Sequence, residues 1–150
     1  MPQSYAGAYY HFIFSTRNWN RDIDDDLAPM LYEYIGGIVR SHAGMLLAAG
    51  GVEDHIHLLA TIPRDLSLSD AMRIVKALSA GWIRRSFPKH RGFAWQAGYG
   101  VFTVSASGVE HVRRYIANQK EHHKAVTYQE EFIRFLIEYG VPFDIETLWE

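Results

Sequence analysis

The segment that most limits the possible folds is an apolar stretch in the middle of the chain that a polar pair interrupts once. Residues 45–52 and 55–62 are each long enough for a strand, and only Glu53 and Asp54 separate them. Pro63 ends the second run. Two apolar runs joined by so short a turn are typical of neighbouring antiparallel strands. The sequence therefore predicts two paired strands joined by a tight turn.

One strand and two helices are predicted on either side of this pair. Residues 9–16 form a run of β-branched and aromatic side chains, which favours a largely buried strand. From 27 to 39 the apolar residues recur at spacings of three and four, which indicates an amphipathic helix. The acidic residues at 22–26 suit the N-terminus of that helix. A second helix is predicted to begin at Ser67, in a capping box with Asp70.

The chain continues with a loop, a short strand and a third helix. Glycines and a proline mark residues 88–100 as the loop, and residues 101–104 can form the strand. Ser107 and Glu110 have the spacing of a capping box, so we expect a helix from Ser107 to about His123.

A last helix is predicted from Thr127, in a capping box with Glu130, to Gly140. The order of elements is then strand, helix, strand, strand, helix, strand, helix, helix. The first six follow the split βαβ plan, an α+β ferredoxin-like sandwich with an antiparallel sheet and helices on one face. We expect the other face to remain partly open for a site or a partner.

Composition indicates a single domain over residues 1–150, with a core of about 7–125 and a C-terminal helical extension at 126–150. The absence of cysteine excludes disulfides, thiolate metal sites and a cysteine nucleophile. The N-terminus lacks a basic region leading into an apolar run, and no apolar window is long enough to span a membrane. We expect a cytoplasmic protein without a membrane partner.

Positive charge is concentrated in one segment, although the formal net charge is −2. The predicted second helix places three basic side chains within about 80° of one another, and further basic residues and two loop aromatics follow. Phosphate contacts from such a stripe and base stacking on loop rings are typical of single-stranded nucleic-acid binding. The candidate DNA-binding residues are Arg73, Lys76, Arg84, Arg85, Lys89, Arg91, Trp95 and Tyr99.

His55 and His57 are candidate metal ligands. Residues two apart on a strand project from the same face, so both side chains can reach one ion. With eight histidines in the chain, chance spacing is an open alternative, and two histidines leave the site incomplete. Another ligand must come from elsewhere in the fold.

Tyr115 is the candidate nucleophile. It lies four residues before Gln119, so the two side chains share a helix face. A phenol has a reference pKa of about 10 and needs a nearby cation or base to attack. His122 and His123 diverge by about 100° on a helix, which predicts surface residues instead of a second metal site.

Four segments occur together in an order that is characteristic of one family: 10–16 (YHFIFST), 53–59 (EDHIHLL), 95–99 (WQAGY) and 115–119 (YIANQ). They resemble the single-tyrosine HUH transposases, also called insertion-sequence-200-like transposases, and especially their REP-associated tyrosine transposase branch. The similarity extends from about Tyr9 to His123.

This resemblance implies a ferredoxin-like domain that acts on single-stranded DNA. It implies that His55 and His57 bind the metal, that Gln119 is a further ligand and that Tyr115 is the nucleophile. It also implies recognition of DNA hairpins and a homodimer in which the tyrosine helix of one subunit can serve the other.

The expected reaction is cleavage and strand transfer through a 5′-phosphotyrosine, with Mg²⁺ or Mn²⁺ and no nucleotide cofactor. Two alternatives remain open at this point. One is a hairpin-binding module of the same fold that does not cut, and the other is a phosphoesterase that uses water and makes no covalent adduct.

Overall fold

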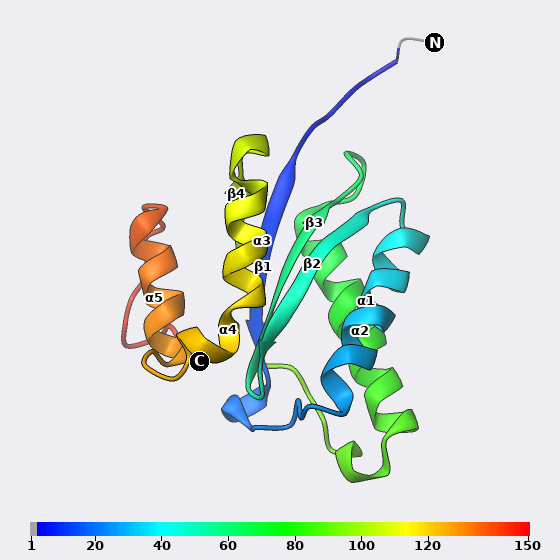
Figure 1. Cartoon of the computed structure of the whole chain (residues 1–150), viewed down its shortest axis with the longest axis vertical. Helices are drawn as coiled ribbons and strands as arrows, with labels where there is room; N and C mark the ends of the chain where they lie inside the picture. Colours follow the sequence, from blue (N-terminus) through cyan, green and yellow to red (C-terminus); the bar gives the residue numbers. More distant parts are fainter. Residues whose placement is uncertain (1–2) are drawn as a thin grey trace.

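Four antiparallel strands form a sheet that separates two groups of helices (Figure 1). The computed structural model describes residues 3–150. The strand order is β2-β3-β1-β4, so β1 pairs with both β3 and β4. This order confirms the ferredoxin-like plan. The strands are β1 (Tyr9–Ser15), β2 (Met45–Val52), β3 (His55–Thr61) and β4 (Gly100–Val104).

Helices cover both faces of this sheet. The helices α1 and α2 lie on one side, and α3, α4 and α5 cover the other, which we expected to remain partly open (Figure 1). The helices are α1 (Leu27–Ser41), α2 (Leu68–Ser86), α3 (Val109–Ala117), α4 (Gln119–His122) and α5 (Tyr128–Glu138), with short 3-10 turns η1 (Arg17–Trp19), η2 (Pro88–His90) and η3 (Ala106–Gly108). In residues 3–150, no helix has both the length and the apolar character to cross a membrane.

Alternation along the central strands divides the interior into two cores. On β1, Phe12 and Phe14 face the main core under α1 and α2, whereas Ile13 joins a smaller core formed largely by α5. On β3, Ile56 and Leu58 belong to the main core. Each such buried side chain contributes about 1.5–3 kcal/mol to folding. His55 and His57 alternate with these residues on β3 and face α3, α4 and α5.

Two of the three predicted helix caps are confirmed. The Ser67 side chain accepts a hydrogen bond from the Asp70 amide at 3.1 Å, and the Thr127 hydroxyl accepts one from the Glu130 amide at 3.2 Å. The cap predicted at Ser107 is wrong, because the residue lies within η3 and its hydroxyl is 3.2 Å from that of Ser105. No side-chain cap bond is formed at the start of α3.

The predicted continuous helix from Ser107 to His123 is also wrong, because it breaks at Asn118. That residue has φ −96° and ψ 17°, outside helical geometry, and separates α3 from α4. His123 follows α4 as its C-cap, with φ −83° and ψ 3°.

A glycine on β2 brings α3 close to the sheet. A Cβ at Gly50 would lie 2.5 Å from the Ile116 carbonyl oxygen, so only glycine permits this approach. Gly50 is paired with His57 across the β2–β3 ladder. The helix that carries Tyr115 is thus placed directly beside the strand that carries the histidines.

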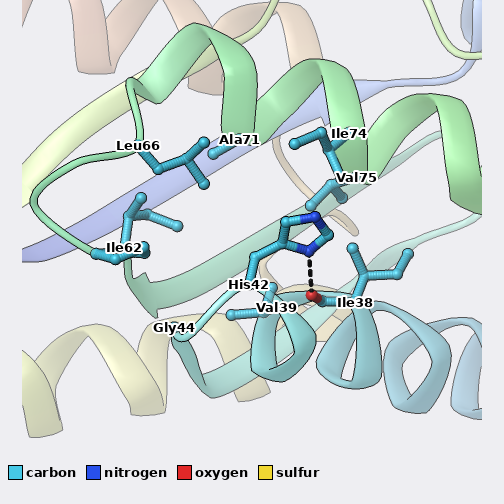
Figure 2. Close-up of a pocket in the computed structure, with 10 residues that line it drawn as sticks. Ile38, Val39, His42, Gly44, Ile62, Leu66, Ala71, Ile74 and Val75 are labelled. Atoms are coloured by element: carbon cyan, nitrogen blue, oxygen red, sulfur yellow. Dashed lines mark hydrogen bonds between the residues drawn. The ribbon is translucent and has the colours of Figure 1, made fainter.

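A small apolar gap lies between α1 and α2, on the opposite face of the sheet. Figure 2 shows its lining, in which His42 Nδ1 donates a hydrogen bond to the Ile38 carbonyl at 3.0 Å. The gap has a volume of about 10 Å³. Ligand pockets are typically 300–1,000 Å³, so this gap is a packing feature.

Candidate metal and nucleophile site

His55 and His57 face the same side of the sheet, as their spacing predicted. Both are fully buried beneath α4 and α5. Their Nε2 atoms approach one carboxylate oxygen, Glu131 Oε1, at 3.4 Å and 2.9 Å. The helix α5, which carries Glu131, therefore closes over the histidine pair.

Three histidines are oriented by hydrogen bonds at Nδ1. His55 Nδ1 donates to Asp54 Oδ1 at 2.7 Å, and His123 Nδ1 donates to the Val126 carbonyl at 2.6 Å. His57 Nδ1 lies 2.8 Å from Nε2 of the buried His11. Outer partners of this kind hold metal-binding histidines in one orientation. In all three rings, Nε2 points toward the same centre.

The ring nitrogens converge with two oxygen donors. One atom from each of four residues lies within 4.8 Å of the others: His55, His57, His123 and Glu131. Gln119 Oε1 lies 3.1 Å from His55 Nε2 and 2.9 Å from His123 Nε2. Imidazole nitrogens with carboxylate and amide oxygens could hold a divalent transition-metal ion. The residues present therefore fit a metal site.

Without an ion, the ring nitrogens and the oxygens of Glu131 and Gln119 can lie this close only if protons form hydrogen bonds between them. Burial opposes the charge on His55, but hydrogen bonds to Asp54 and Glu131 outweigh it and raise its pKa to about 9. Burial dominates at His57 and lowers its pKa to about 4. Burial also opposes the charge on Glu131, yet its hydrogen bonds to the histidines hold its pKa well below the usual range. Without an ion, the centre thus pairs an anionic Glu131 with a protonated His55, and a bound cation would take the place of that proton.

Tyr115 reaches this centre from α3. Its hydroxyl donates a hydrogen bond to Glu131 Oε2 and lies 3.3 Å from His122 Nε2. Burial and the bond to Glu131 both raise the pKa of the phenol above its ordinary value. The tyrosine is therefore held as a neutral phenol, and a bound cation would favour its ionised form.

The prediction that His122 and His123 are surface residues is wrong. His123 is only 7% exposed at its side chain and faces the cluster, while His122 Nε2 lies 3.2 Å from Glu131 Oε2. At 100° per residue, positions 115, 119, 122 and 123 fall within about 100° on one side of a helix. That side carries the buried Gln119, so both histidines face the cluster although they diverge from each other. Sequence reasoning also missed Glu131, whose only local signal is its place on an amphipathic helix.

The candidate DNA-binding residues of α2 lie on the opposite face from this cluster. Two of them are engaged internally: Lys76 Nζ donates to the Gln96 and Gly98 carbonyls, each at 2.6 Å, and Arg84 Nη1 donates to the Phe93 carbonyl at 3.0 Å. These bonds hold the loop before β4. Arg84 is nevertheless exposed, as are Arg73, Arg85, Lys89 and Arg91.

Trp95 is not available for base stacking, contrary to the sequence prediction. It is 7% exposed, and its indole Nε1 donates to Ser79 Oγ at 3.0 Å. Its ring packs in the main core because residue 95 bridges to Thr16 at the end of β1. Tyr99 is partly exposed and lines a pocket of about 400 Å³ that also contacts Tyr128 of α5.

A groove of mixed charge borders the cluster itself. It has a volume of about 590 Å³, and its charged lining residues are Arg21, Lys120 and Lys124 with Asp25, Glu53 and Asp54. Arg21 is paired with Glu53 and Lys120 with Asp25, so the groove carries little unpaired positive charge.

A ferredoxin-like sheet that places a histidine pair beside a helical tyrosine defines a single-tyrosine transposase of the HUH class. The comparison with known families agrees. Residues 4–119 match the family described as "Transposase IS200 like", and the chain belongs to that family. The match ends at Gln119, so His123 and all of α5 lie beyond it.

Individual relatives are transposases as well. The ISDra2 transposase TnpA of Deinococcus radiodurans is 21% identical over 117 residues, which cover 75% of this chain and 84% of that protein. A crystal structure described as a transposase from the same organism has 26% identity and a TM-score of 0.63, covering 79% of this chain and 96% of that one. A REP-associated tyrosine transposase shares the fold, with 19% identity and a TM-score of 0.61 over 84% and 76% of the two chains.

Proposed function

We propose that this protein cleaves and rejoins single-stranded DNA, with Tyr115 as the attacking residue. The observation that carries the proposal is the position of the Tyr115 hydroxyl in the same buried cluster as His55 and His57. Membership of a transposase family supports the reaction class. Movement of DNA by a transposase requires strands to be cut and joined.

In the cleavage step, the Tyr115 oxygen forms a bond to phosphorus while the bond from phosphorus to the 3′ oxygen breaks. The phenolic proton leaves Tyr115, whose hydroxyl is hydrogen-bonded to Glu131 Oε2 and lies 3.3 Å from His122 Nε2, so both groups are within reach of that proton. The departing 3′ oxygen takes up a proton and becomes a hydroxyl. The product is a 5′-phosphotyrosine, and a second 3′-hydroxyl can reverse the step to join new ends, because the covalent link conserves the bond.

His55, His57 and Gln119 are proposed to hold the divalent cation, Mg²⁺ or Mn²⁺. When bound, the ion supplies Lewis-acid stabilisation of charge on the scissile phosphate. Asp54 and His11 orient the two histidine rings through hydrogen bonds at Nδ1, on the far side of each ring from the metal site. No nucleotide is needed, because the protein–DNA link itself stores the energy for joining.

The proposed substrate is a single strand next to a hairpin. The REP-associated relative of known structure is described as bound to a REP hairpin, and we extend that substrate class to this chain. The groove beside His123 contains both basic and acidic side chains that are largely paired with one another, whereas the exposed arginines of α2 lie on the other face of the sheet. If the hairpin binds near α2, its single-stranded flank must pass around the edge of the sheet to reach Tyr115 on the other face.

The test is Tyr115→Phe, which keeps the ring and its packing but removes the attacking oxygen. With a hairpin-flanked single strand and Mn²⁺, wild-type protein should form an adduct that survives denaturing electrophoresis. The variant should bind the same DNA within about twofold and give no product. Mass spectrometry should place the nucleotide on the peptide that contains Tyr115.

Three results would contradict this assignment. Cleavage without an adduct would indicate attack by water, and binding without either product would indicate a binding module. Labelling of Tyr99 or Tyr128 would keep the reaction class but move the nucleophile.

A further inference from the structure

Glu131 is the only carboxylate side chain that is fully buried in residues 3–150, with 1% exposure. Burying a carboxylate is costly unless its charge is paired or binds a metal ion. Glu131 lies on α5, beyond residue 119 where the family match ends. The family match therefore assigns Glu131 no role.

The two oxygens of Glu131 face different groups. Oε1 is directed to the histidine nitrogens, at 2.9 Å from His57, 3.2 Å from His123 and 3.4 Å from His55. Oε2 is directed to the nucleophile and accepts a hydrogen bond from the Tyr115 hydroxyl. A single carboxylate group therefore contacts both the cation-binding centre and the attacking oxygen.

The helix holds this carboxylate firmly. Thr127 caps the first turn of α5, and Tyr128, Phe132 and Leu136 anchor the helix in the smaller core. Glu131 sits between these anchors. Its side chain consequently has little freedom to leave the cluster while α5 stays packed.

We propose that Glu131 is a metal ligand through Oε1 and a positioning residue for Tyr115 through Oε2. This inference rests on the proposed function. One carboxylate would fix the attacking oxygen relative to the cation, and the C-terminal helix would complete the site within a single chain. Carboxylate and imidazole donors together suit a transition-metal ion such as Mn²⁺.

The experiment measures Mn²⁺ binding apart from activity. In the Tyr115→Phe background, Mn²⁺ is titrated without DNA and free ion is followed by electron paramagnetic resonance. Glu131→Gln keeps the size of the side chain but removes its charge, and should weaken Mn²⁺ binding by about tenfold or more. Glu138→Gln, an exposed change on the same helix, should bind Mn²⁺ like its parent.

A second variant separates ligation from structure. Glu131→Asp retains the carboxylate on a shorter side chain and should recover part of the Mn²⁺ affinity that Glu131→Gln loses. With Tyr115 intact, Glu131→Gln should lower the single-turnover rate of adduct formation at saturating Mn²⁺, while DNA affinity stays unchanged. Circular dichroism confirms that both variants are folded.

Unchanged Mn²⁺ affinity in Glu131→Gln would overturn the ligand role. Faster adduct formation in that variant would overturn the positioning role, because the carboxylate would then be blocking the phosphate position. If wild-type protein binds Mn²⁺ through Glu131 but never forms an adduct, the proposed function fails while the metal ligand stands.

Discussion

At the scale of single residues, Trp95 and Tyr99 have opposite environments although they are four positions apart in one loop. Trp95 is packed between Phe14 and Phe93, with its indole nitrogen bonded to Ser79. Tyr99 lies at a pocket and remains partly exposed. Aromatic content alone cannot distinguish a core ring from a stacking ring.

Trp95→Ala should therefore lower stability instead of DNA affinity. Removing a buried tryptophan typically costs about 3–5 kcal/mol, because a cavity replaces its contacts. Urea unfolding should show this loss, while single-strand affinity measured well below the transition should change less than twofold. A variant that is as stable as wild type but binds DNA much more weakly would show that Trp95 belongs to the DNA-binding surface.

The histidines show a similar dependence on their surroundings. His55 and His57 are two residues apart, yet the pKa of His55 is raised to about 9 and that of His57 is lowered to about 4. Burial disfavours charge on both rings, but only His55 has Asp54 bonded to its other nitrogen. Identical residues on one strand thus have different protonation behaviour because their partners differ.

At the scale of elements, α2 combines exposed and internally bonded basic residues. Arg73 is exposed, with only a 3.6 Å contact to Asp70 at the surface. Lys76 is bonded to two loop carbonyls, and burial lowers its pKa. The predicted stripe is therefore a mixture of available charges and structural ones.

Arg73→Ala should weaken single-strand binding and reduce its salt dependence by about 0.7 in slope, since one phosphate contact is lost. Lys76→Met is the matched comparison, and it should lower stability with little change in that slope. Fluorescence titrations over a range of salt concentrations measure both. An unchanged slope for Arg73→Ala would show that Arg73 on α2 makes no phosphate contact.

At the scale of the whole molecule, the cluster is assembled within one chain. Tyr115 from α3, the histidines of β3 and Glu131 of α5 all meet without a second subunit. The family resemblance had implied that the tyrosine helix can serve a partner. The homodimer itself stays a prediction.

Mixed subunits distinguish the two arrangements. If the site works within one chain, subunits with Tyr115→Phe combined with subunits with His57→Ala should give no cleavage, because every subunit lacks one essential group. Mixing either variant with wild type controls for exchange of subunits and should leave activity in proportion to the wild-type chains. Recovered cleavage in the double-variant mixture would show that tyrosine and histidine act across subunits.

Local patterns determined much of this protein from the sequence alone. Strand runs and three-and-four spacing predicted the elements, and the caps at Ser67 and Thr127 are confirmed, because each depends on residues close together in the chain. The shared face of His55 and His57 follows from the two-residue period of a strand. Four short motifs also pointed to the family that the comparison shows.

Tertiary packing alone decided the composition of the cluster. His123 and Glu131 meet His55 only because the buried side of α4 and the helix α5 pack against the same face of the sheet. No periodicity encodes that meeting, since it depends on how distant apolar faces fit together. The same packing buries Trp95 and engages Lys76, so side chains of similar type acquire different roles from the contacts that the fold imposes.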